Sequence, residues 1–185
     1  MARLSPPASF GARLPNPARS MKDVRPSVCV GMHECWGKDG LMQITVAVVD
    51  DAGVVASVRA VGLPGSVFFV RDAWAEKRWG PFAYDVLMER ASEVGLGLAP
   101  DWKEVSPDAR AVWRHYARRR RDVTKRMSTL GLVVPGTRKP YKALFPEARF
   151  VYRKKPRVMG CLVAKGCGTY TYGRTTTSIG DRPLL

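Results

Sequence analysis

The spacing of apolar and polar residues predicts a strand, a loop and a helix in the middle of the chain. Residues 67–70 are all apolar, β-branched or aromatic, which is typical of a short buried strand. After a loop, Pro81 begins a pattern that places apolar residues on one face of a helix, and the glycines that follow are expected to end it. That apolar face consists of Ala83, Val86, Leu87, Ala91 and Val94. A strand, a glycine-containing loop and a helix N-terminus can together present backbone N–H groups to a phosphate.

The segments on either side of this unit also show clear local patterns. Residues 44–49 and 54–58 are strand-like and flank a turn that ends in Gly53, so they predict a β-hairpin. Short strands are also expected near Val30, at Leu98 and over residues 150–152.

A second helix is predicted to begin at Ser106-Pro107-Asp108, because this triplet combines a hydroxyl cap, a first-turn proline and a first-turn acid. Its pattern continues to about Met127. One face is apolar, and another carries basic residues at spacings of three and four. The basic face consists of Arg110, Arg114, Arg118, Arg121 and Lys125.

These segments carry a family resemblance. The sequence GPFAYDVLME, followed by LAPDWKEVSPDARAVWRHY, resembles the GNAT acetyltransferase superfamily and, more narrowly, acetyltransferase-like proteins of tailed bacteriophages. The resemblance spans about residues 43–118. It implies an α+β fold, with a mixed, mostly antiparallel sheet flanked by helices. We therefore expect a basic N-terminal arm (1–27), a GNAT-like core (28–130) and a basic C-terminal extension (131–185).

The resemblance also implies a site for acetyl-CoA. In the superfamily a loop of the form Gln/Arg-x-x-Gly-x-Gly/Ala holds the pyrophosphate, and residues 77–82 match it in part. Lys77, Arg78 and Gly80 are the candidate cofactor contacts. Phe82 stands where a small residue is usual and is expected to crowd a phosphate, and Pro81 has no N–H to donate.

The superfamily places a tyrosine hydroxyl near the departing thiol, and here Trp113 occupies that tyrosine's position. An indole N–H donates a hydrogen bond but is not a general acid. Tyr116, one turn later, and Glu76 are the remaining catalytic candidates, Glu76 by composition only. A catalytically degenerate domain, needing no cofactor, and an active enzyme using acetyl-CoA are both open at this point.

Charge points to an anionic partner. The chain has 31 Lys and Arg against 16 Asp and Glu, a net charge of +15, which favours polyanions or acidic protein surfaces. A solvated surface is the commonest explanation of a charge run, but few acids stand at the i±4 positions to balance this basic helix face, which favours partner binding. The densest basic cluster is Arg153, Lys154, Lys155 and Arg157.

Cysteines and hydropathy exclude some classes of protein. The cysteines at positions 29, 35, 161 and 167 are spaced too widely within each pair for a typical zinc site, so no metal is expected and free thiols are favoured. No apolar stretch reaches the ~20 residues of a membrane span. The expected location is a virion or the host cytoplasm.

Three functions follow from these observations. The first is a structural component of a large assembly, most simply a bacteriophage virion, in which both termini contact other protein subunits and DNA lies nearby. The second is an acetyl-CoA-dependent N-acetyltransferase. The third is a nucleic-acid-binding protein that uses the basic clusters.

Overall fold

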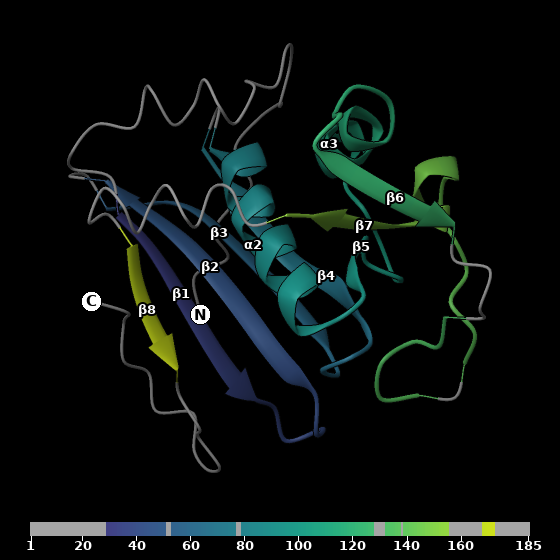
Figure 1. Ribbon diagram of the computed structural model, residues 1–185, viewed down its shortest axis with the longest axis horizontal. Coiled ribbons are helices and arrows are strands. Elements are labelled where there is room, and N and C mark those ends of the chain that lie inside the picture. Colours follow the sequence, from purple (N-terminus) through teal and green to yellow (C-terminus); the bar gives the residue numbers. More distant parts are fainter. Residues whose placement is uncertain are drawn as a thin grey trace.

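The chain folds as an α+β structure (Figure 1). The computed structural model describes residues 29–50, 53–76, 79–127, 132–137, 139–155 and 168–172. Within them lie eight strands: β1 (Cys29–Trp36), β2 (Met42–Asp50), β3 (Gly53–Gly62), β4 (Val67–Ala75), β5 (Gly97–Ala99), β6 (Val123–Met127), β7 (Phe150–Lys154) and β8 (Gly168–Tyr172). The same residues form two α-helices, α2 (Gly80–Val94) and α3 (Pro107–Arg118), and a short 3₁₀ helix, η1 (Pro146–Arg149).

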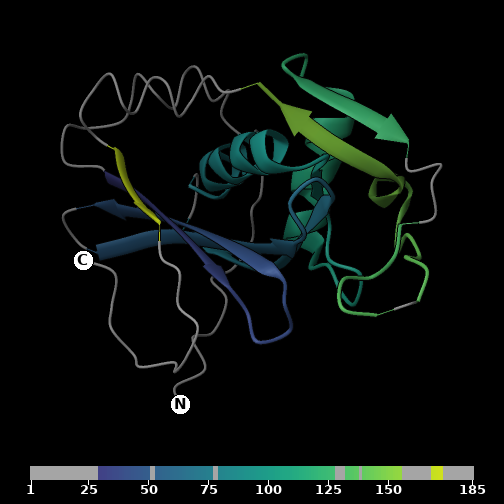
Figure 2. The ribbon, with the colours of Figure 1, turned by 60° about the horizontal axis from the view of Figure 1, so that its bottom comes forward.

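All eight strands belong to one sheet, in the order β6-β7-β5-β4-β3-β2-β1-β8. Neighbouring strands are antiparallel except for β4 with β5 and β1 with β8. Helix α2 connects the parallel strands β4 and β5 and lies across one face of the sheet (Figure 2). The expected α+β fold with a mostly antiparallel sheet is therefore confirmed.

Alternation along the central strands places side chains in two apolar clusters, one on each face of the sheet. Phe68 faces the main core beneath α2 and α3, whereas its neighbour Phe69 lies in a smaller cluster on the opposite face. Trp102 and Tyr141 cover that smaller cluster and pack against the ring of Phe69, with centroids 5.4 and 5.2 Å away. The strands β4, β5 and β7 are thus covered on both faces.

Charged residues fix α2 to the sheet. Arg90 on α2 donates to both carboxylate oxygens of Glu34 on β1, and Lys154 on β7 donates to Glu89. Glu34, Glu89 and Lys154 are all buried. Because a buried charge without a partner is strongly unfavourable, these pairs restrict the orientation of α2.

The local predictions hold in most places. The hairpin is β2 and β3, the strand at residue 67 is β4, and Ser106 caps α3 by accepting a hydrogen bond from the N–H of Ala109 at 3.2 Å. The strand over residues 150–152 is β7. The N-terminal arm 1–27 and much of the 131–185 extension lie outside the described residues. No helix in the described part is long and apolar enough to span a membrane.

The predicted end of the second helix, near Met127, is wrong. Helix α3 ends at Arg118, and Val123–Met127 forms β6 at the edge of the sheet. Arg120 turns inward to the carboxylates of Asp85 and Asp122, which stops the helix. Val123 is then buried while Met127 is 62% exposed. The apparent helical stripe was therefore a coincidence of spacing.

Candidate functional site

Strands β4 and β5 separate soon after they pair. Only residues Val67, Phe68 and Phe69 of β4 have partners on β5, which ends at Ala99 because Pro100 follows it. Strand β4 continues to Ala75 and pairs there with β3. Beyond Phe69, its edge on the β5 side has no strand partner among the residues that the structure describes.

A β-bulge lies at the point of separation. Asp72 pairs with Arg59 and Val70 pairs with Ala60, so Arg71 is the extra residue in β4. The guanidinium of Arg71 lies 4.3 Å from the ring centroid of Trp102 and contacts Asp101 at 3.3 Å. The bulge thus fixes a side chain of β4 to the segment that follows β5.

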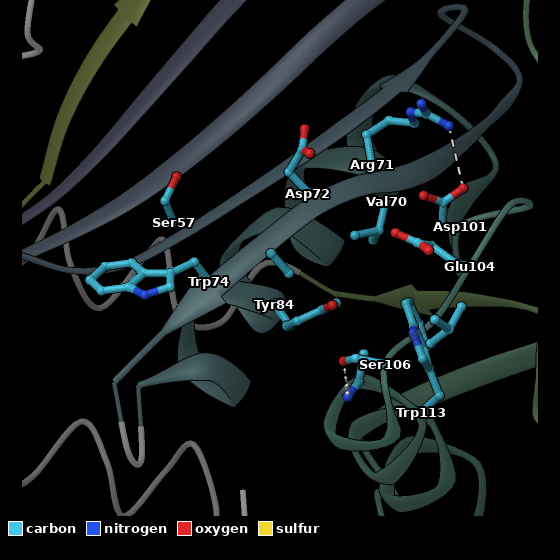
Figure 3. Close-up of a pocket in the computed structure, with 13 residues that line it drawn as sticks. Ser57, Val70, Arg71, Asp72, Trp74, Tyr84, Asp101, Glu104, Ser106 and Trp113 are labelled. Atoms are coloured by element: carbon cyan, nitrogen blue, oxygen red, sulfur yellow. Dashed lines mark hydrogen bonds and ion pairs between the residues drawn. The ribbon is translucent and has the colours of Figure 1, made fainter. Parts of the chain in front are cut away.

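A pocket of about 520 Å³ occupies the gap between β4 and α3 (Figure 3). Strand β4 and Tyr84 of α2 line one side, and the segment from Asp101 to Trp113 lines the other. A second small cavity of about 40 Å³ shares five of these lining residues and extends to Gly80 at the N-terminus of α2. The two cavities are therefore adjacent, and we refer to them together as the groove.

Tyr84 places a hydroxyl group at the buried end of the pocket. The residue is 4% exposed, and its hydroxyl points into the pocket without a hydrogen bond to any residue that the structure describes (Figure 3). Burial, and then the negative charge of Asp101, raise the pKa of Tyr84 above its usual value. The phenol consequently keeps its proton at neutral pH.

The other polar groups of the pocket lie nearer its opening. Glu104 is exposed, extends into the pocket and has no ion pair within the described part of the chain, whereas Asp101 is paired with Arg71. Trp113 is 1% exposed and closes the inner end, with its ring edge-on to Tyr84 at a centroid distance of 5.5 Å. A hydroxyl donor and a carboxylate therefore line the same cavity.

The N-terminus of α2 is where the sequence predicts a phosphate site. The ring of Phe82 is 1% exposed and packs in the core next to Trp79, the residue that precedes the helix. The N–H groups of Gly80 and Phe82 lie in the first turn and have no intrahelical acceptor. Lys77 and Arg78 lie outside the described residues. Pro81, which lies between Gly80 and Phe82, has no N–H to donate.

The two catalytic candidates from the sequence are not part of the pocket lining. The hydroxyl of Tyr116 lies 3.1 Å from both the carbonyl oxygen of Pro81 and Oδ1 of Asp85, below α2 in the core. Burial, followed by the charge of Asp85, raises the pKa of Tyr116 well above its usual value. Glu76 is exposed just beyond β4. Tyr116 is therefore a structural residue that joins α3 to α2.

The basic candidates divide into surface and buried groups. Arg110, Arg114, Arg118, Arg121 and Lys125 are exposed. By contrast, Lys154 is buried against Glu89, and Arg153 donates to the backbone carbonyl of Ser92. Lys155 is exposed, and Arg157 lies outside the described residues. The run 153–157 is therefore not a single basic surface within the described part.

Sequence reasoning missed Tyr84, Asp101, Glu104 and Arg71. Tyr84 sits among the apolar residues of an amphipathic helix, where an aromatic residue usually belongs to the core. The available signal was Pro100, which ends β5 and directs the acidic segment after it toward β4. Among the described residues no three His, Cys, Asp or Glu side chains group as metal ligands, and Cys35 is a free thiol.

Comparison with known proteins gives no relative. No family model, curated protein or solved structure matches the chain.

Proposed function

We propose that the protein is a GNAT-like N-acetyltransferase that binds acetyl-CoA along the free edge of β4 and acetylates an amine. The observation that carries this proposal is the pocket between β4 and α3, with the hydroxyl of Tyr84 at its buried end and without a hydrogen-bond partner in the described part of the chain. The order of hairpin, strand, loop and a helix that begins at a glycine, within a mostly antiparallel sheet, supports it.

The donor groups of the site fit a long ligand with phosphates at one end and amides along its length. The first-turn N–H groups of Gly80 and Phe82 suit an anionic group, and Lys77 is expected to add charge there. The backbone edge of β4 beyond Phe69, which pairs with no described strand, offers donors and acceptors to an extended chain, as a strand edge offers them to a peptide. Acetyl-CoA, when bound, supplies the acyl thioester.

Two side chains would then move protons. The carboxylate of Glu104 accepts the proton that the attacking amine loses as the C–N bond forms. The hydroxyl of Tyr84 donates a proton to the sulfur as the C–S bond breaks, and recovers it afterwards from solvent. Trp113 closes the inner end of the pocket against water. The tyrosine therefore comes from α2, whereas the family resemblance places it at Trp113.

A test compares two tryptophan substitutions on the same helix. Ala109 lines both cavities, whereas Ala111 lines neither, so Ala109→Trp fills the groove and Ala111→Trp is its control. We expect micromolar acetyl-CoA binding by calorimetry in the wild type and in Ala111→Trp, and its loss in Ala109→Trp. Release of free thiol with a panel of primary amines reports turnover.

The outcomes separate the alternatives. The proposed acetyl-CoA site is contradicted if the wild type does not bind at up to about 1 mM acetyl-CoA. It is also contradicted if both tryptophan variants bind equally well. Binding without thiol release overturns the enzymatic part and favours a catalytically degenerate domain. The structural role in a virion depends on the N-terminal arm and C-terminal extension, of which the structure describes only part, so it stays a prediction.

A further inference from the structure

Five basic residues gather on one surface although the helix predicted to carry them is interrupted. Arg110, Arg114 and Arg118 lie on α3, Arg121 lies in the turn after it, and Lys125 lies on β6. Lys125 belongs with them because its ammonium group donates to the backbone carbonyl of Ala117 in the last turn of α3. We call these five residues the α3–β6 surface.

The charge of this surface is poorly balanced. Arg114 and Arg118 both approach Oε1 of Glu147 on η1, at 4.0 and 3.4 Å, so one acid serves two arginines. The arginine side chains are nevertheless 58% and 69% exposed, and that of Glu147 only 10%. Asp122 nearby is already bonded to the buried Arg120. An excess of positive charge therefore faces solvent.

Two of the cations are held in fixed positions. Arg110 donates through Nε to the carbonyl oxygen of Val105 at 3.2 Å, and its guanidinium lies 5.6 Å from the ring centroid of Phe145. Lys125 lies 5.5 Å from the ring centroid of Phe150. Cations fixed in advance lose less conformational entropy when they bind an anion.

Some of this arrangement has an internal explanation. Cations near the C-terminus of a helix are stabilised by its dipole, which accounts for Arg118 and Lys125. The dipole does not explain Arg110 in the first half of α3, and like charges at i,i+4 repel along the row of arginines. An anionic partner relieves that repulsion.

We propose that the α3–β6 surface binds the phosphate backbone of nucleic acid without reading its bases. The three arginines on α3 are one turn apart, about 6 Å, which suits a polymer whose negative charges repeat regularly better than it suits an acidic protein. Planar guanidinium groups also bind phosphate through paired hydrogen bonds. None of the five residues lines the pocket, so this proposal does not depend on the proposed acetyltransferase activity.

The test measures the salt dependence of binding to fluorescent 20-nucleotide single- and double-stranded DNA of unrelated sequences. The full chain is compared with Arg114→Gln/Arg118→Gln/Arg121→Gln and with a control of equal charge change. That control is Lys38→Gln/Lys103→Gln/Lys139→Gln, three exposed lysines outside the surface. The logarithm of the affinity decreases linearly with the logarithm of the salt concentration. In the arginine variant we expect this line to be less steep, by about 1 in slope for each substituted arginine that pairs with a phosphate in the wild type. The slope should change little in the lysine control.

Three results would overturn the proposal. One is an equal loss of affinity in both variants, which indicates a general effect of net charge. Another is an unchanged slope in the arginine variant. A third is equally tight binding of poly-glutamate of similar length, which indicates an acidic protein partner. Thermal unfolding verifies that each variant is folded, and Arg121→Glu alone repeats the test if the triple variant is not.

Discussion

The ammonium group of Lys154 donates a hydrogen bond to the carboxylate of Glu89, and the two side chains are 1% and 0% exposed. Lys154 is at the end of β7 and Glu89 is in the middle of α2, 65 residues earlier. The backbone N–H of Lys154 also donates to the hydroxyl of Ser92, one turn further along α2. The pair therefore fixes β7 to the helix that begins at the candidate phosphate site.

Lys154→Met should lower the free energy of unfolding by about 3–5 kcal/mol, because it leaves the carboxylate of Glu89 buried without its ammonium partner. The double variant Glu89→Leu/Lys154→Met should recover most of this loss, since it buries no charge. Urea denaturation of the two single variants and the double variant measures the coupling between the residues. Additive losses would show that the two side chains act independently.

Asp85→Asn should change how stability depends on pH. Burial raises the pKa of Asp85 to about 6, against the opposing charges of Arg120 and Lys154. The folded state therefore holds a proton that the unfolded state releases near pH 4, so the wild type loses stability as pH rises from about 4 to about 6. Between pH 4 and 7 the stability of Asp85→Asn should rise relative to wild type by up to roughly 3 kcal/mol.

Chemical denaturation across that pH range checks the sign of this effect. A difference between Asp85→Asn and wild type that stays constant from pH 4 to 7 would mean that Asp85 is ionised throughout, held so by Arg120.

Tyr84→Phe should lower kcat by about 10²–10⁴-fold while acetyl-CoA affinity and thermal stability stay near wild-type values. The hydroxyl has no hydrogen-bond partner among the described residues, so its removal leaves the packing against Trp113 intact. Thiol release and calorimetry measure the two quantities separately. An unchanged kcat in an otherwise active protein would exclude Tyr84 as the proton donor without affecting the proposed function.

Gly97→Ala should lower the free energy of unfolding by more than about 2 kcal/mol. Gly97 has φ +123°, and an added Cβ would lie 2.4 Å from the backbone oxygen of Tyr152. Strand β5 would then have to move away from β7. Gly40→Ala is the control, because Gly40 also has positive φ (+73°) but open space around it. Equal losses in both variants would mean that backbone strain alone is responsible.

Local signals in the sequence were enough to predict the hairpin, α2 and the start of α3. Each depends on neighbouring residues, such as the turn at Gly53 or the Ser106 cap. The end of α3 was not predictable in this way, because it is fixed by Arg120 bonding to Asp85 on another helix. The role of β8 as a partner of β1 is likewise a contact between distant parts of the chain.

The candidate site was only partly predictable for the same reason. Gly80 belongs to a recognisable sequence motif and, as the first residue of α2, borders the groove. Tyr84, Asp101 and Glu104 come from separate segments and meet only because β4 and β5 diverge after three residue pairs. A pattern within one segment carries no information on such a divergence.

The borders of the sheet affect how one copy of the chain can associate with another. At one border β8 pairs with β1, so the backbone of β1 is already occupied on both sides. At the other border β6 carries Lys125 and Arg126, and two such strands brought together would repel. Addition of strands from further copies is therefore opposed by charge at β6, and at the other border β8 covers the edge of β1 that such a strand would otherwise pair with. Removal of the segment that contains β8 should expose β1 and favour aggregation.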